Sequence, residues 1–258
     1  MKRLMFYKYV GVETALRIIT SGKLMYTTPD KFNDPYDTYA STPKVGFHKM
    51  MKRIMSERDP DAEVITQGNF RGRERLYMGM DREEMRRNAV KHFAITCFSK
   101  SPYILPMWAH YADNHAGCVL GFQVDNENEE ELKRMFLQGK KSTSGDLLYP
   151  LDVTYDDARP PIYNKNGLTN HDETPKVFLT KAKAWSYEQE VRCFRLGSSG
   201  VYDYKRSQLK QVYFGLKMKH EDRTSIKKAL DINKKHFQVE VKICDVIMHL
   251  SNYELQKL

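Results

Sequence analysis

The sequence has 258 residues, of which 41% are hydrophobic and 29% are charged. This composition is that of a globular protein and excludes a disordered or low-complexity chain. No stretch reaches the roughly 18 consecutive apolar residues that a membrane-spanning helix needs, and the N-terminus lacks the apolar core of a secretory signal. We therefore expect a cytoplasmic protein with no membrane partner.

The formal net charge is +9. An excess of this size favours a phosphate-bearing ligand or a nucleic acid, although a solvated basic surface is the simpler alternative. The four cysteines lie far apart and form no CxxC pair, which predicts buried free thiols and no metal site.

The first half of the chain predicts strands and helices in alternation around one charged segment. Residues 43–91 are rich in Arg, Lys, Met and Glu, and we interpret them as a helical insertion or subdomain. Gly22 is expected to cap the first helix. The other expected elements are a strand at 4–9, a helix at 12–21, strands at 24–27 and 92–98, a helix at 106–115 and a strand at 117–124.

The second half predicts more strands than helices. A long polar loop is expected at 156–174, and loops of that length are often functional. The expected helices are 128–138, 177–185 and 221–230, and the expected strands are 147–155, 191–196, 211–215, 237–243 and 246–250.

The expected strands and helices do not alternate strictly along the chain, and they do not fall into one all-strand and one all-helix region. They favour an α+β fold with a mixed or mostly antiparallel central sheet and flanking helices, in a single domain spanning 1–258. The phosphate-binding motifs GxGxxG and GxxxxGK[ST] are absent, as are GxSxG and HExxH.

Three clusters carry residues suited to chemistry, and the first joins an early strand to a turn. Tyr7 and Tyr9 share one face of the strand and can flank a planar ring, while Lys8 lies between them. The turn contributes Phe32, and Asn33 with Asp34 adds hydrogen-bond acceptors. The alternative is that the tyrosines are half-buried core residues and the Asn-Asp pair only makes an Asx turn.

The second cluster follows the strand that ends at Ser99. Trp108 and Tyr111 fall on one helical face, whereas His110 lies on another, where it can carry a proton or donate a hydrogen bond. The alternative is that both aromatic residues anchor the helix in the core.

The third cluster is W-S-Y-E-Q-E-V-R, residues 185–192. If the chain is extended from Tyr187, Glu188, Glu190 and Arg192 share one face. Two adjacent carboxylates suit a ligand that carries or develops positive charge. The alternative is a surface edge strand whose charges are paired.

The ordered set YKY, FNDPYD, CFS, MWAHYADNHAG and WSYEQEVR resembles a bacterial family of unknown function, DUF2971-like, from about residue 6 to residue 215. The chain also resembles, more faintly, the ADP-ribosyltransferases. Their pattern is an aromatic, His or Arg on a first strand, a Ser, Thr or Tyr on a middle strand and a late Glu, often in an E-x-E pair. Tyr7 or Tyr9, Ser99 or Tyr111, and Glu188 with Glu190 follow that order.

This second resemblance implies a split sheet with a helical insertion and NAD as a substrate. Glu190 would stabilise the ribose cation as nicotinamide leaves, either glutamate would activate the acceptor, and Arg192 or Lys8 would meet the pyrophosphate. The expected function is an NAD-consuming ADP-ribosyltransferase or glycohydrolase, in a bacterial toxin or anti-phage defence effector. The alternative is a non-catalytic nucleotide or nucleic-acid binding or sensor module that uses the aromatic clusters for stacking.

Overall fold

The structure is a computed structural model that describes residues 3–41, 93–125, 148–161 and 174–258. The predicted insertion at 43–91 and the predicted helix at 128–138 lie outside the described residues. The helices are α1 (Val12–Ser21), α5 (Leu105–Tyr111), α7 (Thr174–Leu179) and α8 (His220–Phe237), with 3-10 turns η1 (Pro29–Lys31), η2 (Asp113–His115), η3 (Lys183–Glu188) and η4 (Arg206–Gln208). The strands are β1 (Arg3–Val10), β2 (Lys23–Tyr26), β3 (Phe93–Ser99), β4 (Cys118–Asp125), β5 (Leu151–Asp152), β6 (Thr154–Tyr155), β7 (Thr180–Lys181), β8 (Glu190–Leu196), β9 (Gly200–Asp203), β10 (Leu209–Phe214), β11 (Lys242–Met248) and β12 (Leu255–Lys257).

The chain divides into two compact units. The larger unit comprises Met1–Thr27, Ala94–Val153 and Ala184–Leu258, and the smaller comprises Thr28–Phe93 and Thr154–Lys183. The prediction of one domain with a helical insertion stays a prediction, because the insertion is not among the described residues.

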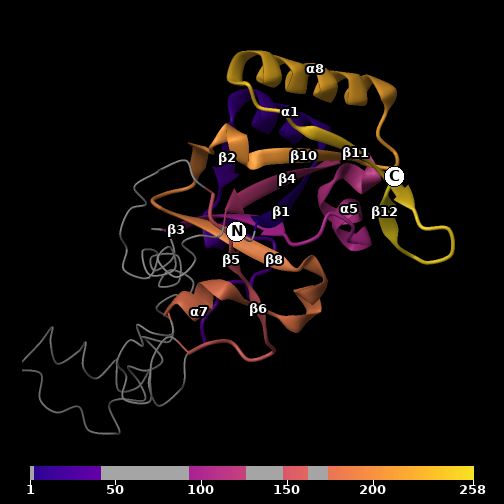
Figure 1. The fold of residues 1–258 in the computed structure, drawn as a ribbon. Helices are drawn as coiled ribbons and strands as arrows, with labels where there is room; N and C mark the ends of the chain where they lie inside the picture. Colours follow the sequence, from indigo (N-terminus) through magenta and orange to yellow (C-terminus); the bar gives the residue numbers. More distant parts are fainter. Residues whose placement is uncertain (1–2, 42–92, 126–147, 162–173) are drawn as a thin grey trace, which may run out of the picture. The chain divides into compact units, whose positions relative to one another are not determined.

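The larger unit is built on one sheet of eight strands in the order β12-β11-β10-β4-β1-β3-β8-β5. Strand β1 pairs antiparallel with both β4 and β3, and β10 pairs parallel with β11 but antiparallel with β4. The sheet is therefore mixed and mostly antiparallel, as predicted for the α+β class (Figure 1). A short antiparallel pair, β2 with β9, adds to this unit.

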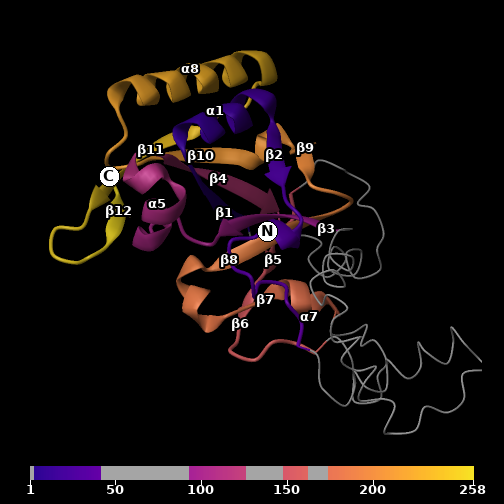
Figure 2. The same ribbon diagram turned by 180° about the vertical axis from the view of Figure 1, so that it is seen from behind.

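Helices α1 and α8 lie side by side over one face of the large sheet (Figures 1 and 2). Their buried residues, such as Ile19 and Ile226, pack on aromatic rings that the strands present on that face. The rings of Phe6, Phe98 and Phe122 contact one another with centroids 4.9 to 5.9 Å apart. We call this the helical face of the sheet.

The first helix begins and ends where the sequence predicts. Gly22 has φ +70°, in the left-handed region, and its N–H donates to the carbonyl of Ile18. That conformation is strained for residues with a Cβ, which explains a glycine at this helix end. The side chain of Arg206 donates to the carbonyls of Ile19 and Thr20 and so completes the cap.

Two predictions in the middle of the chain are wrong. The single strand expected at 147–155 is divided, since β5 pairs with β8 of the large sheet whereas β6 pairs with β7 of the smaller unit. The helix expected at 177–185 stops at Leu179, because the chain then enters β7 and the 3-10 turn η3. In both cases the partner strand decides the structure, and it lies about 25 to 40 residues away along the chain.

The C-terminal prediction also needs correction. Helix α8 continues to Phe237, and the expected strands at 237–243 and 246–250 are one strand, β11, which pairs with β12.

Among the described residues, no helix is long and apolar enough to cross a membrane.

Candidate active site

The candidate site lies on the sheet face opposite the helical face, where β1, β3 and β8 are neighbours. Tyr7 of β1 is directly opposite Ser99 of β3 in the antiparallel register. The next residue of β3, Lys100, donates its N–H to the carbonyl of Gln189 at 2.9 Å, which sets β8 beside it. Because Phe6, Phe98 and Val191 face the helices, their neighbours Tyr7, Ser99 and Glu190 face the other way. We call this the polar face.

Glu190 and Arg192 form a buried ion pair on the polar face. The carboxylate accepts from Nε of Arg192 at 2.7 Å and from its Nη2 at 3.2 Å. The side chain of Arg192 is 0% exposed and that of Glu190 is 4% exposed. The two side chains share a face because they are two residues apart in one strand, as predicted, and β8 is no edge strand because it lies between β3 and β5.

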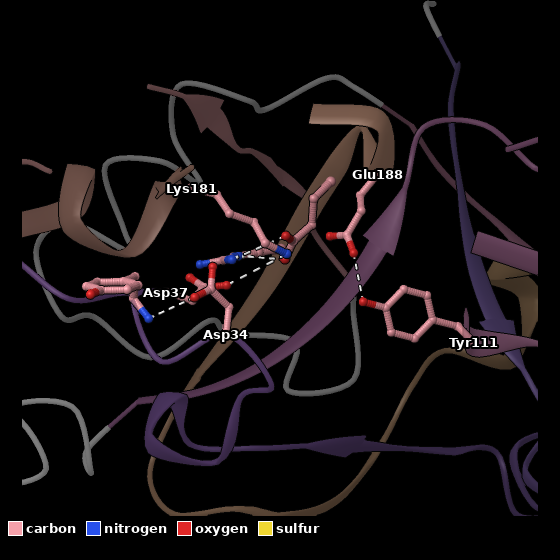
Figure 3. Close-up of polar contacts among 8 residues, drawn as sticks. Asp34, Asp37, Tyr111, Lys181 and Glu188 are labelled. Atoms are coloured by element: carbon pink, nitrogen blue, oxygen red, sulfur yellow. Dashed lines mark hydrogen bonds and ion pairs between the residues drawn. The ribbon is translucent and has the colours of Figure 1, made fainter. Parts of the chain in front are cut away.

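The prediction that Glu188 continues this strand is wrong. Glu188 ends the 3-10 turn η3, and Gln189 has φ +47° before β8 begins. The Glu188 carboxylate instead accepts a hydrogen bond of 2.7 Å from the hydroxyl of Tyr111, the last residue of α5 (Figure 3). Glu188 is 4% exposed and Tyr111 is half-buried. Both carboxylates are therefore inside the protein, each with a different partner.

Tyrosine rings lie beside these groups on the polar face. Tyr213 of β10 contacts Tyr7 and Tyr103 edge to face, with both pairs of ring centroids 5.9 Å apart. Gly121 lies under Tyr7, because a Cβ on it would come within 3.3 Å of the ring. Burial raises the pKa values of Tyr7 and Tyr213, so both hydroxyls are neutral near pH 7.

Cys97 lies close to the ion pair but has little reactivity of its own. Burial raises the pKa of its thiol well above the ordinary value, and the nearby carboxylate of Glu190 raises it further. Because the thiolate is the nucleophilic form, this thiol is held in its inert form.

Within the described part of the chain, no three His, Cys, Asp or Glu side chains are grouped so that they could hold a metal ion.

Lys8 points to the helical face, away from Tyr7. Its ammonium donates to Thr96 Oγ1 at 3.0 Å and to the Cys97 carbonyl at 2.9 Å. It also lies 5.0 Å from the centroid of the Phe98 ring. Burial lowers the pKa of Lys8, while the Cys97 and Cys193 thiols and Glu190 oppose that shift. Lys8 and Arg192 are thus both engaged by protein groups.

Tyr9 and Trp108 pack into the core beside the site. Their rings meet edge to face at 5.5 Å, and Trp108 is 0% exposed. The Tyr9 hydroxyl donates to the carbonyl of Ser101 and accepts from the N–H of Ile104, while the indole N–H of Trp108 donates to the carbonyl of Pro102. These contacts fit the structural alternative, in which both rings fix the loop before α5.

His110 is exposed on α5, one residue before Tyr111. Its ring centroid is 6.2 Å from that of Tyr111, in a tilted arrangement. The two residues leave the helix in different directions, as their predicted positions on different helical faces require.

Phe32, Asn33 and Asp34 belong to the smaller unit, so the first predicted cluster is divided between the two units. Asp34 accepts from the N–H of Tyr36 at 2.8 Å, which is the expected Asx turn. In the same unit Lys181 lies 3.8 Å from a carboxylate oxygen of Asp37, and both side chains are buried (Figure 3).

Sequence reasoning missed Tyr103 and Tyr213. Tyr213 lies in a short strand with buried Val212 and Phe214 on either side, so alternation within 209–214 places it on the face opposite to theirs. That pattern identifies a face, but only the pairing of β10 with β4 brings Tyr213 to Tyr7.

The comparisons with known proteins agree with the resemblance read from the motifs. Residues 107–193 match a family model described as "Protein of unknown function (DUF2971)". Over this segment the chain is similar to that family. The matched DUF2971-like segment contains Tyr111, both glutamates and Arg192, whereas Tyr7 and Ser99 lie before it. No curated protein and no solved structure matches the chain.

Proposed function

We propose that this protein consumes NAD, as an ADP-ribosyltransferase or an NAD glycohydrolase, in the setting of a bacterial toxin or defence effector. The observation that supports this most is the common face shared by Tyr7, Ser99 and Glu190, one residue from each of three neighbouring strands. About 90 residues of sequence separate Tyr7 from Ser99, and about 90 separate Ser99 from Glu190, yet the three residues lie on adjacent strands.

The electrostatics of this face suit the reaction. Cleavage of the bond between nicotinamide and ribose develops positive charge on the ribose, and buried carboxylates stabilise such charge more than exposed ones do. Glu190 on this face and Glu188 at the end of η3 are both at least 96% buried. The net charge of +9 favours the approach of the NAD phosphates or of a nucleic-acid acceptor.

The test is to incubate the purified protein with NAD and to measure free nicotinamide by chromatography. We expect turnover by the native protein and a loss of about 100-fold or more in Glu190→Gln, because one preorganised charge contact typically contributes this much. Glu221→Gln, at an exposed site in α8, is the matched control and should retain full activity. Absence of nicotinamide release by the native protein would refute the proposal.

A non-catalytic nucleotide-binding module is the second candidate. The cluster of Tyr7, Tyr103 and Tyr213 favours it, because base rings stack on tyrosine without any chemical step. In the same experiment this candidate predicts no nicotinamide release, together with salt-sensitive retention of NAD or of a single-stranded oligonucleotide that is weakened in Tyr7→Ala.

A further inference from the structure

The row of residues that contains Tyr7 continues across the polar face, on the strands β4, β10 and β11 that follow β1 in the sheet (Figure 1). Tyr7 pairs with Gly121 of β4, which in turn pairs with Gln211 of β10. Gln211 then pairs with Lys242 of β11. Because directly paired residues of neighbouring strands point to the same face of a sheet, Lys242 lies on the polar face.

A second lysine reaches the same end of the polar face from β12. Lys257 pairs with Val246 of β11, which is four residues after Lys242 and therefore shares its face. The side-chain nitrogens of Lys242 and Lys257 lie within hydrogen-bonding range of each other, and both residues are exposed. We call these two residues the lysine pair.

The contact between the two amines is unfavourable until an anion binds. Lys257 lowers the pKa of Lys242, through the hydrogen bond between the side chains and through the repulsion of like charges. The other side chains that act on the lysine pair are Cys244 and Tyr103, so within the described residues no carboxylate compensates its charge. A phosphate that accepts from both amines would remove the repulsion.

Tyrosine rings lie beside the lysine pair. Lys257 is within electrostatic range of Tyr103, whose ring contacts that of Tyr213. Tyr213 is buried, and its hydroxyl donates to Oε1 of Gln211 at 2.7 Å. Tyr103 is only half-buried, so part of its ring is open to a base. A base and its own phosphate, which are neighbours in every nucleotide, therefore fit Tyr103 and the lysine pair together.

The lysine pair is far from the carboxylate that is proposed to meet the ribose. Strands β8 and β11 are five places apart in the sheet order, which is about 24 Å at a spacing of about 4.8 Å between strands. One nucleotide cannot place its ribose at Glu190 and its own phosphate at Lys242 across that distance. The lysine pair therefore does not bind the phosphate attached to the reacting ribose, whereas a chain of several nucleotides spans both positions.

We infer that Tyr103 and the lysine pair bind a nucleotide of a single-stranded nucleic acid, with the base on the Tyr103 ring and the phosphate between the amines. Single strands are favoured because their bases are free to stack on an aromatic side chain, whereas those of a duplex are not. The net charge of +9 favours the approach of such a polyanion. The further role of this nucleic acid as the ADP-ribose acceptor rests on the proposed function.

In that role, the bond between ribose C1′ of NAD and the nicotinamide nitrogen breaks, and its electron pair stays on that nitrogen. A nucleophilic nitrogen or oxygen of the nucleic acid bonds to C1′ and releases its proton to solvent. The lysine pair exchanges no proton in this reaction and only holds the strand.

The test measures the binding of a labelled single-stranded DNA of about 12 nucleotides by fluorescence anisotropy, without NAD. We expect the double variant Lys242→Gln and Lys257→Gln to lower the affinity about tenfold and to reduce the slope of log affinity against log salt by about 1, because one phosphate contact is lost. The double variant Lys227→Gln and Lys228→Gln is the matched control, since it removes the same charge from exposed positions of α8. This control should lower the affinity less than about twofold.

A second variant, Tyr103→Leu, separates stacking from charge. It should lower the affinity for the single strand about tenfold without changing the salt dependence, because a base loses its ring partner while the phosphate keeps both amines. Binding to a duplex of the same sequence should be weaker in the native protein and unchanged in Tyr103→Leu. Tyr103→Phe keeps the ring and should bind as the native protein does, and thermal unfolding of each variant identifies any loss that comes from misfolding.

The outcomes separate this site from the proposed function. Absence of DNA binding by the native protein, or equal losses in the lysine-pair variant and its matched control, overturns the site whether or not nicotinamide is released. A rise in the KM for NAD in the lysine-pair variant without a loss of DNA affinity also overturns it, because the pair then serves NAD. Lysine-dependent DNA binding with no nicotinamide release, in the presence or absence of DNA, keeps the site and overturns the proposed function and the acceptor role.

Discussion

The two faces of the eight-stranded sheet are built from the same strands but differ in chemistry. The helical face carries apolar rings such as Phe122, packed beneath α1 and α8. The polar face carries Ser99, Glu190 and Arg192, each at most 3% exposed. The helical face gains stability from apolar burial, whereas the polar face must pair each buried charge that it holds. The two faces of one sheet therefore place different demands on the side chains that they bury.

The largest effect should come from opening a cavity in the helical face. Phe122 is 0% exposed and its ring contacts those of Phe6, Phe98 and Tyr204. We expect Phe122→Ala to lower the free energy of unfolding by about 4 kcal/mol, as large-to-small changes in a packed core do. Urea denaturation followed by circular dichroism measures this loss.

The control for this cavity is Phe237→Ala, at a ring that is 50% exposed at the end of α8. This substitution should lower the free energy of unfolding by less than half as much as Phe122→Ala does. Equal losses at the two positions would contradict the claim that burial of the Phe122 ring stabilises the helical face.

A smaller loss should follow when the polar face loses one half of its buried ion pair. Arg192→Met keeps the bulk but removes the guanidinium that binds the buried Glu190 carboxylate, which should cost about 3 kcal/mol. Adding Glu190→Gln removes that charge and should restore most of the stability. If the single and double variants unfold at the same urea concentration, charge pairing is not what the polar face requires.

The smallest effect concerns Lys8, a base placed on the apolar side. Burial holds its pKa below the ordinary 10.5 in the folded state. Between the folded value and 10.5 the unfolded chain binds more protons, so the free energy of unfolding rises with pH across this window. Lys8→Met should flatten this rise in urea titrations, whereas Lys227→Met, at an exposed site, should leave it unchanged. An unaltered slope in Lys8→Met would contradict the burial of the ammonium.

Part of the fold and of the candidate site was predictable because its signals are local. The absence of strict strand–helix alternation indicated the α+β class, and Gly22 marked the end of α1. Alternation predicted that Glu190 and Arg192 share a face, which the 2.7 Å ion pair confirms. Each of these inferences uses only neighbouring residues.

The errors arose where a distant contact decides the conformation. The left-handed turn at Gln189 depends on a hydrogen bond from Lys100, which is 89 residues away in sequence. That turn ends the extended segment expected from Tyr187. The Glu188 carboxylate then accepts a hydrogen bond from Tyr111 instead of lying along β8. No window of sequence around Glu188 contains that information.

The sequence by itself determined which side chains alternate along each strand, because a period of two is a property of the extended backbone. Only the tertiary structure decided which strands became neighbours. Tyr7, Ser99 and Glu190 share one face because β1 pairs with β3 and β3 with β8, and these pairings depend on burying Phe6, Phe98 and Val191 together beneath the helices. Long-range burial of apolar side chains thus fixed the position of the polar ones.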